Sequence, residues 1–524
     1  MRVEPSVMAP RRRRKHWGWG WEDEQPSPGE LREAAAGLAA HLGFGSVEPE
    51  APAAPRLAPA RVDVPQALAA ICSQDDHARA LHAHGASYLD VVRGFRGRFP
   101  HAPDAVALPG DEADLLRVLE WCAQARLAVT PYGGGTSVVG GVDPVAGPRH
   151  AGAVSVDLSR LDRVLEVDGV SRAARIQAGA NGPRLEAQLA EHGLTMRFYP
   201  QSFEQSTLGG WIATRAAGHF ATGPTHVDDL VESVRAVTAG GSVWESRRLP
   251  GSGAGPSPDR MLLGSEGTLA VITEAWVRVR PKPEARRSAG VAFAEFATAV
   301  DAVRTILHAG LRPANCRLIS AREAALTFAG DGSSALLVLG FEEDVSGADR
   351  AFAICRDHGG QVREGSGGGS GAWREAFLRA PYLRDALVAM GVLTETFETA
   401  VTWERLPGLM ASVQEAATEA LGGDGEVTCR LTHAYVDGAA PYFTVLAPAR
   451  RGEEEAQWSA IKAVASDAIL AAGGTITHHH AVGRDHRRWY DRQRPGPFAA
   501  AMRAAKDALD PDSLLNPGVL WEPR

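Results

Sequence analysis

The chain has 524 residues, of which 44% are hydrophobic and 23% are charged. This composition is typical of a globular protein, and the length predicts two or three domains because a single hydrophobic core rarely grows so large. Basic side chains number 55 and acidic ones 63, which gives a net charge of −8. That balance argues against nucleic acid as a partner, since such binding needs a surplus of lysine and arginine on one face.

The sequence predicts neither secretion nor a membrane span. Five widely spaced cysteines include no C-x-x-C pair, which indicates free thiols in a reducing compartment. No apolar run reaches the roughly 18 residues of a transmembrane helix, the N-terminus lacks a signal-peptide core, and Trp521 to Arg524 do not form a peroxisomal signal. We therefore expect a cytoplasmic protein. The basic run Arg11 to Lys15 is either a solvated tail or a contact with an anionic lipid surface.

In chain order, the first 30 residues are polar and rich in proline, apart from the cluster Trp17 to Trp21. Helical spacing follows at 30–42 and 76–94, on either side of a proline-rich linker at 46–62. Beyond residue 101, the patterns predict strands at 105–108, 127–130, 153–157, 174–178, 234–238 and 270–280, and helices at 111–125, 182–192 and 207–217.

The second half alternates strand and helix patterns over 285–430, with a glycine-rich turn from Gly365 to Gly371. Its last predicted elements are strands at 425–434, 441–447 and 475–480 and helices at 454–472 and 497–510. A final turn follows at Leu514 to Gly518. These patterns together predict an α+β fold.

The segment Pro131 to Ser137 reads Pro-Tyr-Gly-Gly-Gly-Thr-Ser and follows a predicted strand. Three glycines permit positive φ angles and let backbone amides approach an anion such as a pyrophosphate, while Thr136 and Ser137 add hydroxyl donors. The segment is neither a Rossmann fingerprint nor a Walker loop, since it lacks the G-x-G-x-x-G spacing and the lysine. Taken alone, it is explained equally well by a structural turn.

Two further stretches follow the glycine loop, Ser206 to Gly218 and Leu263 to Thr273. The three stretches, in this order, resemble the FAD domain of the vanillyl-alcohol-oxidase family. The resemblance implies that the first loop holds the FAD diphosphate and that the other two line the isoalloxazine and adenine ends. No histidine lies in the loop, so we expect FAD to be held non-covalently. The implied cofactor-binding residues are Pro131, Tyr132, Gly133, Gly134, Gly135, Thr136, Ser137, Gln201, Ser202, Ser206, Thr207, Thr214, Arg215, Ala216, Ala217, Glu266, Gly267, Thr268, Leu269, Val271 and Ile272.

The same resemblance implies the architecture. We expect a two-subdomain FAD-binding domain of the vanillyl-alcohol-oxidase (PCMH) type and an α+β cap domain with an antiparallel sheet and flanking helices. The expected division is an N-terminal tail and helical region at 1–98, the FAD domain at 99–283, the cap or substrate domain at 284–496, and a C-terminal helix and turn at 497–524 that return to the FAD domain.

Segments outside the FAD stretches resemble the alkyldihydroxyacetonephosphate synthase family. They are His16 to Gly20, Arg79 to Pro100, Pro313 to Leu318, Tyr382 to Asp385, Glu395 to Thr399, Gly438 to Phe443 and Thr477 to Gly483. That family exchanges the acyl chain of acyl-dihydroxyacetonephosphate for a long-chain alcohol through a flavin adduct, in ether lipid synthesis. The resemblance thus implies lipid substrates, and it allows peripheral membrane contact and a homodimer.

Within these segments, the resemblance assigns catalysis to Tyr442, His478, His479, His480 and Arg317. It assigns substrate binding to Arg384 and Thr396. The residue types suit the chemistry, because proton abstraction beside a carbonyl needs a base, a nearby imidazolium lowers the pKa of a phenol, and arginine pairs phosphate oxygens.

Each assignment also has a purely structural interpretation. Without the family resemblance, Tyr442 would be interpreted as a strand residue packed in the core, and Arg317 and Arg384 as members of surface ion pairs. In a strand, His478 and His480 would face one side and His479 the other. The triple histidine could then hold a metal, but no cysteine or aspartate completes a zinc set, so we expect no metal.

Two positions depart from the family pattern: Gln201 stands where an acidic residue is usual, and Phe198 where a histidine is usual. Both changes alter the charge expected near the flavin. An alternative function is therefore an FAD-linked oxidoreductase that oxidises a 2-hydroxy acid of the lactate or glycolate type, or an alcohol. Its members share the Pro131 to Ser137 motif and the Asn516-Pro517-Gly518 end. A third hypothesis is a flavin-binding protein without catalysis.

Overall fold

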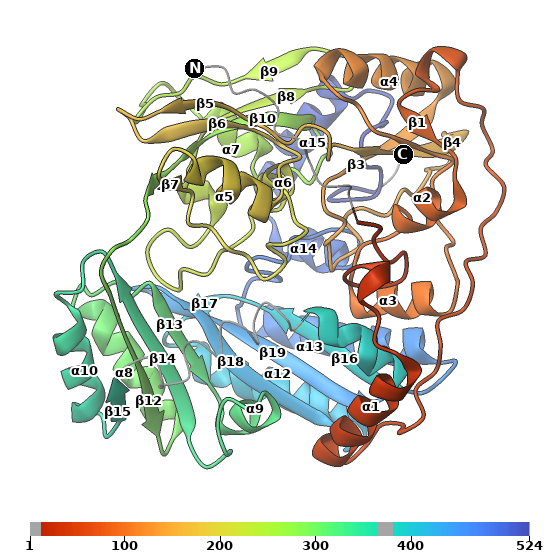
Figure 1. Ribbon diagram of the computed structural model, residues 1–524. Helices are drawn as coiled ribbons and strands as arrows, with labels where there is room; N and C mark the ends of the chain where they lie inside the picture. The colour runs from red at the N-terminus through yellow and green to blue at the C-terminus, as the bar shows by residue number, and fades with distance from the viewer. Residues whose placement is uncertain (1–11, 365–380, 523–524) are drawn as a thin grey trace.

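A computed structural model describes residues 12–364 and 381–522, and Figure 1 shows its arrangement. Several smaller sheets form the upper half, and one large sheet crosses the lower half. This α+β architecture is the predicted one. The turn expected at Gly365 to Gly371 lies outside the described residues, and the predicted domain boundaries stay a prediction.

The first sheet of the upper half has the order β1-β2-β4-β3, in which β2, β4 and β3 run parallel. Its strands are β1 (Cys72–Ser73), β2 (Ala105–Ala107), β3 (Leu127–Tyr132) and β4 (Gly152–Asp157). Helix α4 (Glu112–Ala125) joins β2 to β3, and the Asp111 side chain accepts the Asp114 N–H at 2.8 Å. The helix therefore begins with the predicted cap, which satisfies one of its free amides.

The second sheet of the upper half is antiparallel, with the order β5-β6-β10-β8-β9. Its strands are β5 (Val164–Asp168), β6 (Ala173–Gln177), β8 (Val231–Val237), β9 (Val243–Glu245) and β10 (Val271–Arg278), while β7 (Leu194–Thr195) pairs with β11 (Arg280–Pro281). Three helices accompany it: α5 (Gly182–Ala190), α6 (Leu208–Thr214) and α7 (Pro258–Leu262). The two sheets and these helices share one hydrophobic core.

The C-terminal segment returns to this half, as expected. After α14 (Arg487–Gln493) and α15 (Gly496–Leu509), the chain runs alongside β3, where Val129 exchanges backbone hydrogen bonds of 2.7 Å with Leu514 and Asn516. The buried Lys506 ammonium donates to the Thr268 carbonyl at 2.6 Å. The tail therefore fixes the turn that precedes β10.

The lower half is an antiparallel sheet with the order β15-β12-β14-β13-β18-β19-β16, and β17 pairs with β19 (Figure 1). Its strands are β12 (Arg286–Phe293), β13 (Asn315–Ile319), β14 (Ala335–Glu342), β15 (Gln361–Glu364), β16 (Val392–Glu398), β17 (Val401–Thr402), β18 (Glu426–Ala434) and β19 (Gly438–Pro448). Helices α8 (Phe296–His308), α10 (Ala348–Asp357), α12 (Leu406–Leu421) and α13 (Glu454–Ala471) pack against this sheet.

Side chains alternate along the central strands, so the hydrophobic core lies on one face of the large sheet. Phe397, Cys429 and Phe443 belong to the core that includes residues of α12 and α13. Their strand neighbours point to the opposite face of the sheet, because successive side chains in a strand alternate. The short helix α9 (Ala321–Leu326) lies against β14 and β18.

The N-terminal segment connects the two halves. Trp17 and Trp19 are buried, and Lys15 forms a buried ion pair of 3.1 Å with Asp385. The helices that follow are α1 (Pro28–Leu42), α2 (Asp76–Leu81) and α3 (Tyr88–Phe95). The single helix predicted at 76–94 is thus two helices, because Ser87 caps a new one with a reciprocal Ser87–Asp90 pair of hydrogen bonds.

The strand predicted at 475–480 is wrong, since Thr475 to His480 form no regular element. The backbone amides of His478, His479 and His480 bind a carboxylate instead of a neighbouring strand. None of the helices within 12–364 and 381–522 combines the length and hydrophobicity that crossing a bilayer requires. All five cysteines lie in the described ranges as free thiols, as predicted.

Candidate active site

The glycine loop after β3 lies against the stretch that precedes α6. A Cβ atom at Gly133 would come within 2.3 Å of the Thr207 hydroxyl oxygen, and one at Gly134 within 2.0 Å of the Gln205 carbonyl oxygen. Any side chain would therefore push the loop away, because such contacts are far below van der Waals distance. The glycines bring two of the three predicted FAD stretches together and leave the loop amides without side chains beside them.

The third predicted FAD stretch lies against the same glycine loop. We call the three stretches together the FAD cradle. A Cβ atom at Gly267 would lie 2.9 Å from Pro131, and Gly267 has a φ of +69°, which favours glycine. The Ser265 hydroxyl and the Asn516 Oδ1 atom are buried there, and neither has a hydrogen-bond partner among the residues that the structure describes. Buried polar atoms are normally satisfied. These residues thus fit the polar edge of a bound FAD.

The other predicted cofactor residues surround this cradle, and their contact with FAD stays a prediction. Thr207 caps α6 and Arg215 ends it in a left-handed conformation. The Ser206 hydroxyl accepts the indole N–H of Trp211 at 2.7 Å, which holds the start of α6 in place. Gln201 and Ser202 precede α6, Thr214 ends it, Ala216 and Ala217 follow it, and Thr268, Leu269, Val271 and Ile272 lie in or just before β10.

Glu266 ties the third predicted FAD stretch to Thr477 to Gly483, which we call the histidine segment. Its carboxylate accepts the backbone N–H groups of Val482 at 2.9 Å and Gly483 at 2.8 Å. Burial raises the pKa of Glu266 to about 7, although these two donors oppose the shift. The third FAD stretch and the histidine segment therefore hold each other in place.

Sequence reasoning missed Arg14, which also reaches the glycine loop. Its guanidinium donates to the Gly134 carbonyl at 2.6 Å and to the Gln205 side chain at 2.5 Å. The basic run was interpreted only as a tail or a lipid contact. Arg14 instead fixes the junction of the first two FAD stretches from the N-terminal segment.

A row of buried polar side chains crosses the face of the large sheet that lies opposite the core with α12 and α13. In the register of β16, β19 and β18, Tyr442 lies opposite Glu398 on one side and Arg430 on the other. Directly paired residues share a face. Arg430 in turn pairs with Ile319, two residues from Arg317, which places Arg317 on the same face. The strand pairing thus brings together residues more than 100 positions apart.

Tyr442 is buried and covered by a cation. The Arg430 guanidinium carbon lies 3.9 Å from the centre of the Tyr442 ring, and the Thr396 hydroxyl hydrogen-bonds to Tyr442. Burial raises the pKa of Tyr442, whereas Arg430 and Thr396 oppose that rise. Arg430 was not predicted from the sequence, although it lies at an alternating position of a predicted strand.

The arginines of this face have different surroundings. Arg430 forms a buried ion pair with Glu323 of α9. Arg317 is also buried, and burial together with the like charge of Arg430 lowers the pKa of Arg317 to about 9. Guanidinium groups keep their proton in proteins. We therefore interpret this direction as an electropositive site that would be stabilised by an anion.

The predicted histidines surround Glu398. Its carboxylate accepts the backbone N–H groups of His478, His479 and His480 at 2.7, 3.2 and 3.0 Å, and the Thr477 hydroxyl at 2.6 Å. Burial opposes the charge, but the imidazoles and the Thr477 hydroxyl outweigh it and lower the pKa of Glu398 well below its ordinary value. The three histidines therefore curve around one ionised carboxylate, and the alternating arrangement expected of a strand does not occur.

A further imidazole that sequence reasoning missed lies beside the histidines. His433 of β18 offers a ring nitrogen within 4.8 Å of nitrogens on His478 and His479. The ring nitrogens of His433 contact the Thr432 hydroxyl at 3.0 Å and the Gly218 carbonyl at 3.2 Å. These hydrogen bonds would have to be displaced by a bound metal, and the expected absence of a metal stays a prediction. The sequence signal that could have found His433 is its position next to the end of the strand predicted at 425–434.

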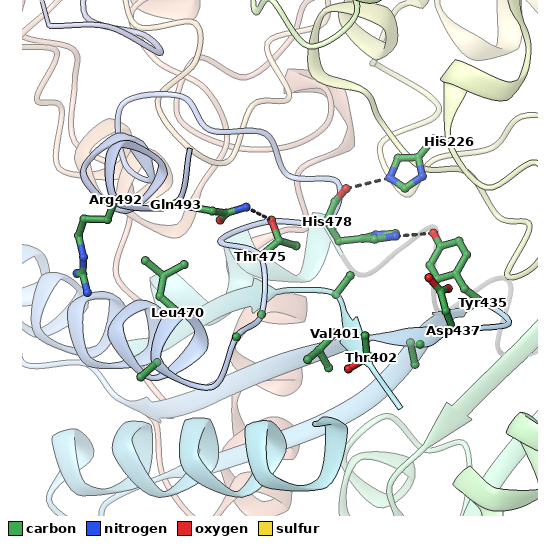
Figure 2. A pocket seen from close by; sticks show the side chains of 16 residues that line it. His226, Val401, Thr402, Tyr435, Asp437, Leu470, Thr475, His478, Arg492 and Gln493 are labelled. Carbon is green, nitrogen blue, oxygen red and sulfur yellow. Dashed lines mark hydrogen bonds between the residues drawn. The ribbon is translucent and has the colours of Figure 1, made fainter. Parts of the chain in front are cut away.

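A pocket of about 920 Å³ opens beside His478 (Figure 2). Its apolar floor comes from β17, the start of β19 and the C-terminal end of α13, and includes Val401 and Leu470. His226 and Tyr435 lie together at one end of the pocket, and both are hydrogen-bonded to His478 (Figure 2). The pocket thus connects the histidine segment to the outside.

Arg384 and Thr396, the predicted substrate-binding residues, lie on different elements. Thr396 is on β16 and touches Tyr442. Arg384 lies in the helical segment 381–389 and donates to the Ala86 carbonyl at 2.6 Å. The positive charge of Arg384 also acts on Tyr442. Both predicted residues are therefore near the candidate catalytic tyrosine.

Phe198 and Gln201, the two departures from the family pattern, lie beside and just before α6. Phe198 is buried, and its ring packs against Trp211 with 5.2 Å between centres. A Cβ atom at Gly218 would come within 2.8 Å of this ring. Phe198 thus fills space between α6 and the segment that leads to His226. Gln201 is half-buried just before α6.

Comparison with known proteins agrees with this geometry. Residues 103–247 match the family model described as "FAD binding domain", and residues 282–520 match that of the C-terminal domain of FAD linked oxidases. The chain is 31% identical to alkyldihydroxyacetonephosphate synthase of Dictyostelium discoideum, over 84% of this chain and 77% of that protein. It is 27% identical to glycolate oxidase subunit GlcD of Bacillus subtilis, over 81% of this chain and 90% of that protein.

The comparison of folds also finds alkyldihydroxyacetonephosphate synthase. A solved structure of alkyldihydroxyacetonephosphate synthase superimposes with a TM-score of 0.80 at 27% identity, and the match covers 96% of this chain and 98% of the other. The cradle and the large sheet therefore define a flavoprotein of the FAD-linked oxidase class, with FAD as its cofactor. Within that class, the chain belongs to the alkyldihydroxyacetonephosphate synthase family.

Proposed function

We propose that the protein exchanges the acyl chain of acyl-dihydroxyacetonephosphate for a long-chain alcohol, releasing a fatty acid. The observation that supports this most directly is the buried Tyr442 between Arg430 and the histidine segment, on a face that also carries Arg317. Bound FAD would supply an electron-accepting ring.

The roles follow from the positions of the charges. Tyr442 and the histidines provide proton acceptors within a buried site, as removal of a proton beside a carbonyl requires. Arg384 and Arg317 provide positive charge for the substrate phosphate and for the departing carboxylate. The pocket beside His478 supplies an apolar wall for an aliphatic chain.

The test is an assay of the purified yellow protein with acyl-dihydroxyacetonephosphate, with and without a long-chain alcohol. Alcohol-dependent formation of an alkyl ether together with fatty acid release supports the proposal. Absence of both products from protein that retains FAD would refute it.

A second candidate is the oxidation of a 2-hydroxy acid or an alcohol. It is favoured by the three imidazoles of His433, His478 and His479, whose nitrogens lie within 4.8 Å of one another and could bind a divalent ion. Anaerobic addition of lactate or glycolate separates the candidates, because only an oxidoreductase would bleach the flavin absorbance.

Lipid substrates also suggest where the protein acts. We propose a peripheral contact with the cytoplasmic side of a membrane, and a homodimer as the form in solution. Flotation with liposomes that contain anionic lipid tests the first, and sedimentation equilibrium tests the second.

A further inference from the structure

Five side chains form one continuous series of hydrogen bonds beside the pocket. His226 Nε2 contacts the carbonyl oxygen of His478 at 2.9 Å, and His226 Nδ1 contacts the Thr225 hydroxyl at 3.2 Å. The Thr225 hydroxyl lies 3.0 Å from that of Tyr435, which lies 2.6 Å from His478 Nε2. His478 Nδ1 then lies 2.9 Å from His479 Nδ1. We name this series the tautomer chain; Figure 2 shows its contacts between His226, His478 and Tyr435.

The backbone carbonyl at one end gives the tautomer chain a direction. A carbonyl only accepts, so His226 Nε2 carries a hydrogen, and in neutral His226 the Nδ1 atom is an acceptor. Thr225 therefore donates to His226 and must accept from Tyr435, which has a single hydrogen to donate. Tyr435 then accepts from His478 Nε2. Since neutral His478 has one ring hydrogen, its Nδ1 atom accepts from Nδ1 of His479.

The charge beside His479 agrees with this direction. Glu398 Oε2 lies 3.5 Å from His479 Nδ1, so a hydrogen on Nδ1 faces a carboxylate as well as the His478 lone pair. Burial lowers the pKa of His479, although Glu398 opposes the shift, and burial raises the pKa of Tyr435 to about 12. Both shifts favour the uncharged forms, an imidazole with one ring hydrogen on His479 and a hydroxyl that keeps its hydrogen on Tyr435.

We propose that the tautomer chain fixes the single ring hydrogen of His479 on Nδ1 and leaves Nε2 as the proton acceptor of the active site. This inference rests on the proposed alkyl transfer. In that reaction the substrate C–H bond breaks, its electron pair stays on the carbon beside the carbonyl, and the proton forms a bond to Nε2. The resulting imidazolium is stabilised by Glu398, which faces its Nδ1–H group.

Thr225, His226 and Tyr435 are then positioning residues, because they act through His479. Thr225 is only 2% exposed, so solvent in the pocket does not replace its hydroxyl. His226 and Tyr435 line the pocket and are half-buried. The buried threonine is therefore the point at which the direction of the chain can be tested with least disturbance of the pocket.

Thr225→Val removes the hydroxyl with little change in shape. Tyr435 then loses its acceptor and can turn to donate to His478 Nε2, which moves the His478 hydrogen to Nδ1 and the His479 hydrogen to Nε2. The acceptor needed for catalysis would be occupied. We expect turnover to fall by roughly ten- to a hundredfold, since an imidazole held in the wrong tautomer is a poor base. Thr225→Ser keeps the hydroxyl and should retain turnover.

The decisive measurement is nitrogen NMR of FAD-loaded protein labelled with ¹⁵N-histidine, with the His479 signals identified by their loss in His479→Gln. We expect the hydrogen on Nδ1 in the wild type and in Thr225→Ser, and on Nε2 in Thr225→Val. A wild-type hydrogen on Nε2 overturns the inference, as does an unchanged tautomer and turnover in Thr225→Val. Equal loss in Thr225→Ser would also overturn it, by indicating a purely structural role.

If Thr225→Val does not retain FAD, Tyr435→Phe provides the same test from the next position. It removes the link between Thr225 and His478, so the His479 signals should become a mixture of both tautomers. A single wild-type tautomer in Tyr435→Phe would contradict the inference. Because the tautomer is read without substrate, failure of the alkyl-transfer assay leaves this result interpretable.

Discussion

Glu398 accepts the backbone N–H of His478 at 2.7 Å, although the two residues lie 80 positions apart. The same carboxylate accepts the amides of His479 and His480 and the Thr477 hydroxyl. One fully buried anion thus determines the path of the histidine segment. It explains how three consecutive histidines meet Tyr442 without forming a strand.

Glu398→Gln should therefore disrupt the site while preserving the side-chain shape. An amide places an NH₂ group against backbone donors, and the loss of a charged acceptor costs about 3 kcal/mol. We expect turnover to fall at least a hundredfold and the apparent Tm to fall by roughly 5 °C. Assays and thermal melts of the exposed Glu404→Gln serve as the control. Wild-type turnover in Glu398→Gln would show that the carboxylate does not organise the histidines.

Tyr442→Phe tests the tyrosine itself. Removing the hydroxyl takes away the group that contacts Thr396 but keeps the ring beneath Arg430. We expect turnover to be abolished while the flavin spectrum and FAD content stay unchanged. The matched control is Tyr490→Phe on α14, whose ring packs against Arg494, the residue that follows the helix. Substantial turnover in Tyr442→Phe would remove this residue from the mechanism.

How much of this site could be predicted depends on the range of the interactions. The glycine loop, Tyr442 and the histidine motif are local patterns, and the family resemblance identified them. Arg430 and Glu398 needed the register of three strands, which no local pattern gives. The strand predicted at 475–480 failed because the local sequence could not reveal that a distant carboxylate binds the amides of its three histidines.

The stability of the protein should depend on pH through Glu266. Burial raises the pKa of Glu266 from 4.5 to about 7, so the folded state holds this proton more tightly than the unfolded state. The associated stability is present below pH 4.5 and is lost as the pH rises to about 7, a change of about 3 kcal/mol. Urea unfolding of FAD-free protein at pH 5 and pH 7.5 measures it.

In Glu266→Gln this pH dependence should become smaller, because the variant side chain does not titrate. The exposed Glu33→Gln should retain the wild-type difference between the two pH values. If Glu266→Gln loses stability with pH as steeply as the wild type does, the titrating group lies elsewhere.

The glycine loop gives the most direct test of the FAD cradle. Gly134→Ala would bring a methyl group within 2.0 Å of the Gln205 carbonyl oxygen, so the loop must move away from α6. We expect the FAD content of the purified protein to fall at least tenfold, measured as the ratio of absorbance at 450 and 280 nm. Because the contact is with backbone, a change of rotamer cannot relieve it, and the displacement must reach the loop amides that are predicted to face the diphosphate.

Gly37→Ala in α1 is the matched control, since a Cβ atom there meets nothing within 4 Å. Alanine in a helix interior should stabilise the protein by about 0.5–1 kcal/mol and leave the FAD content unchanged. Normal FAD content in Gly134→Ala would mean that the diphosphate does not lie against this loop. A loss in both variants would instead indicate that FAD retention follows global stability, so the pair separates a local effect of the cradle from a general one.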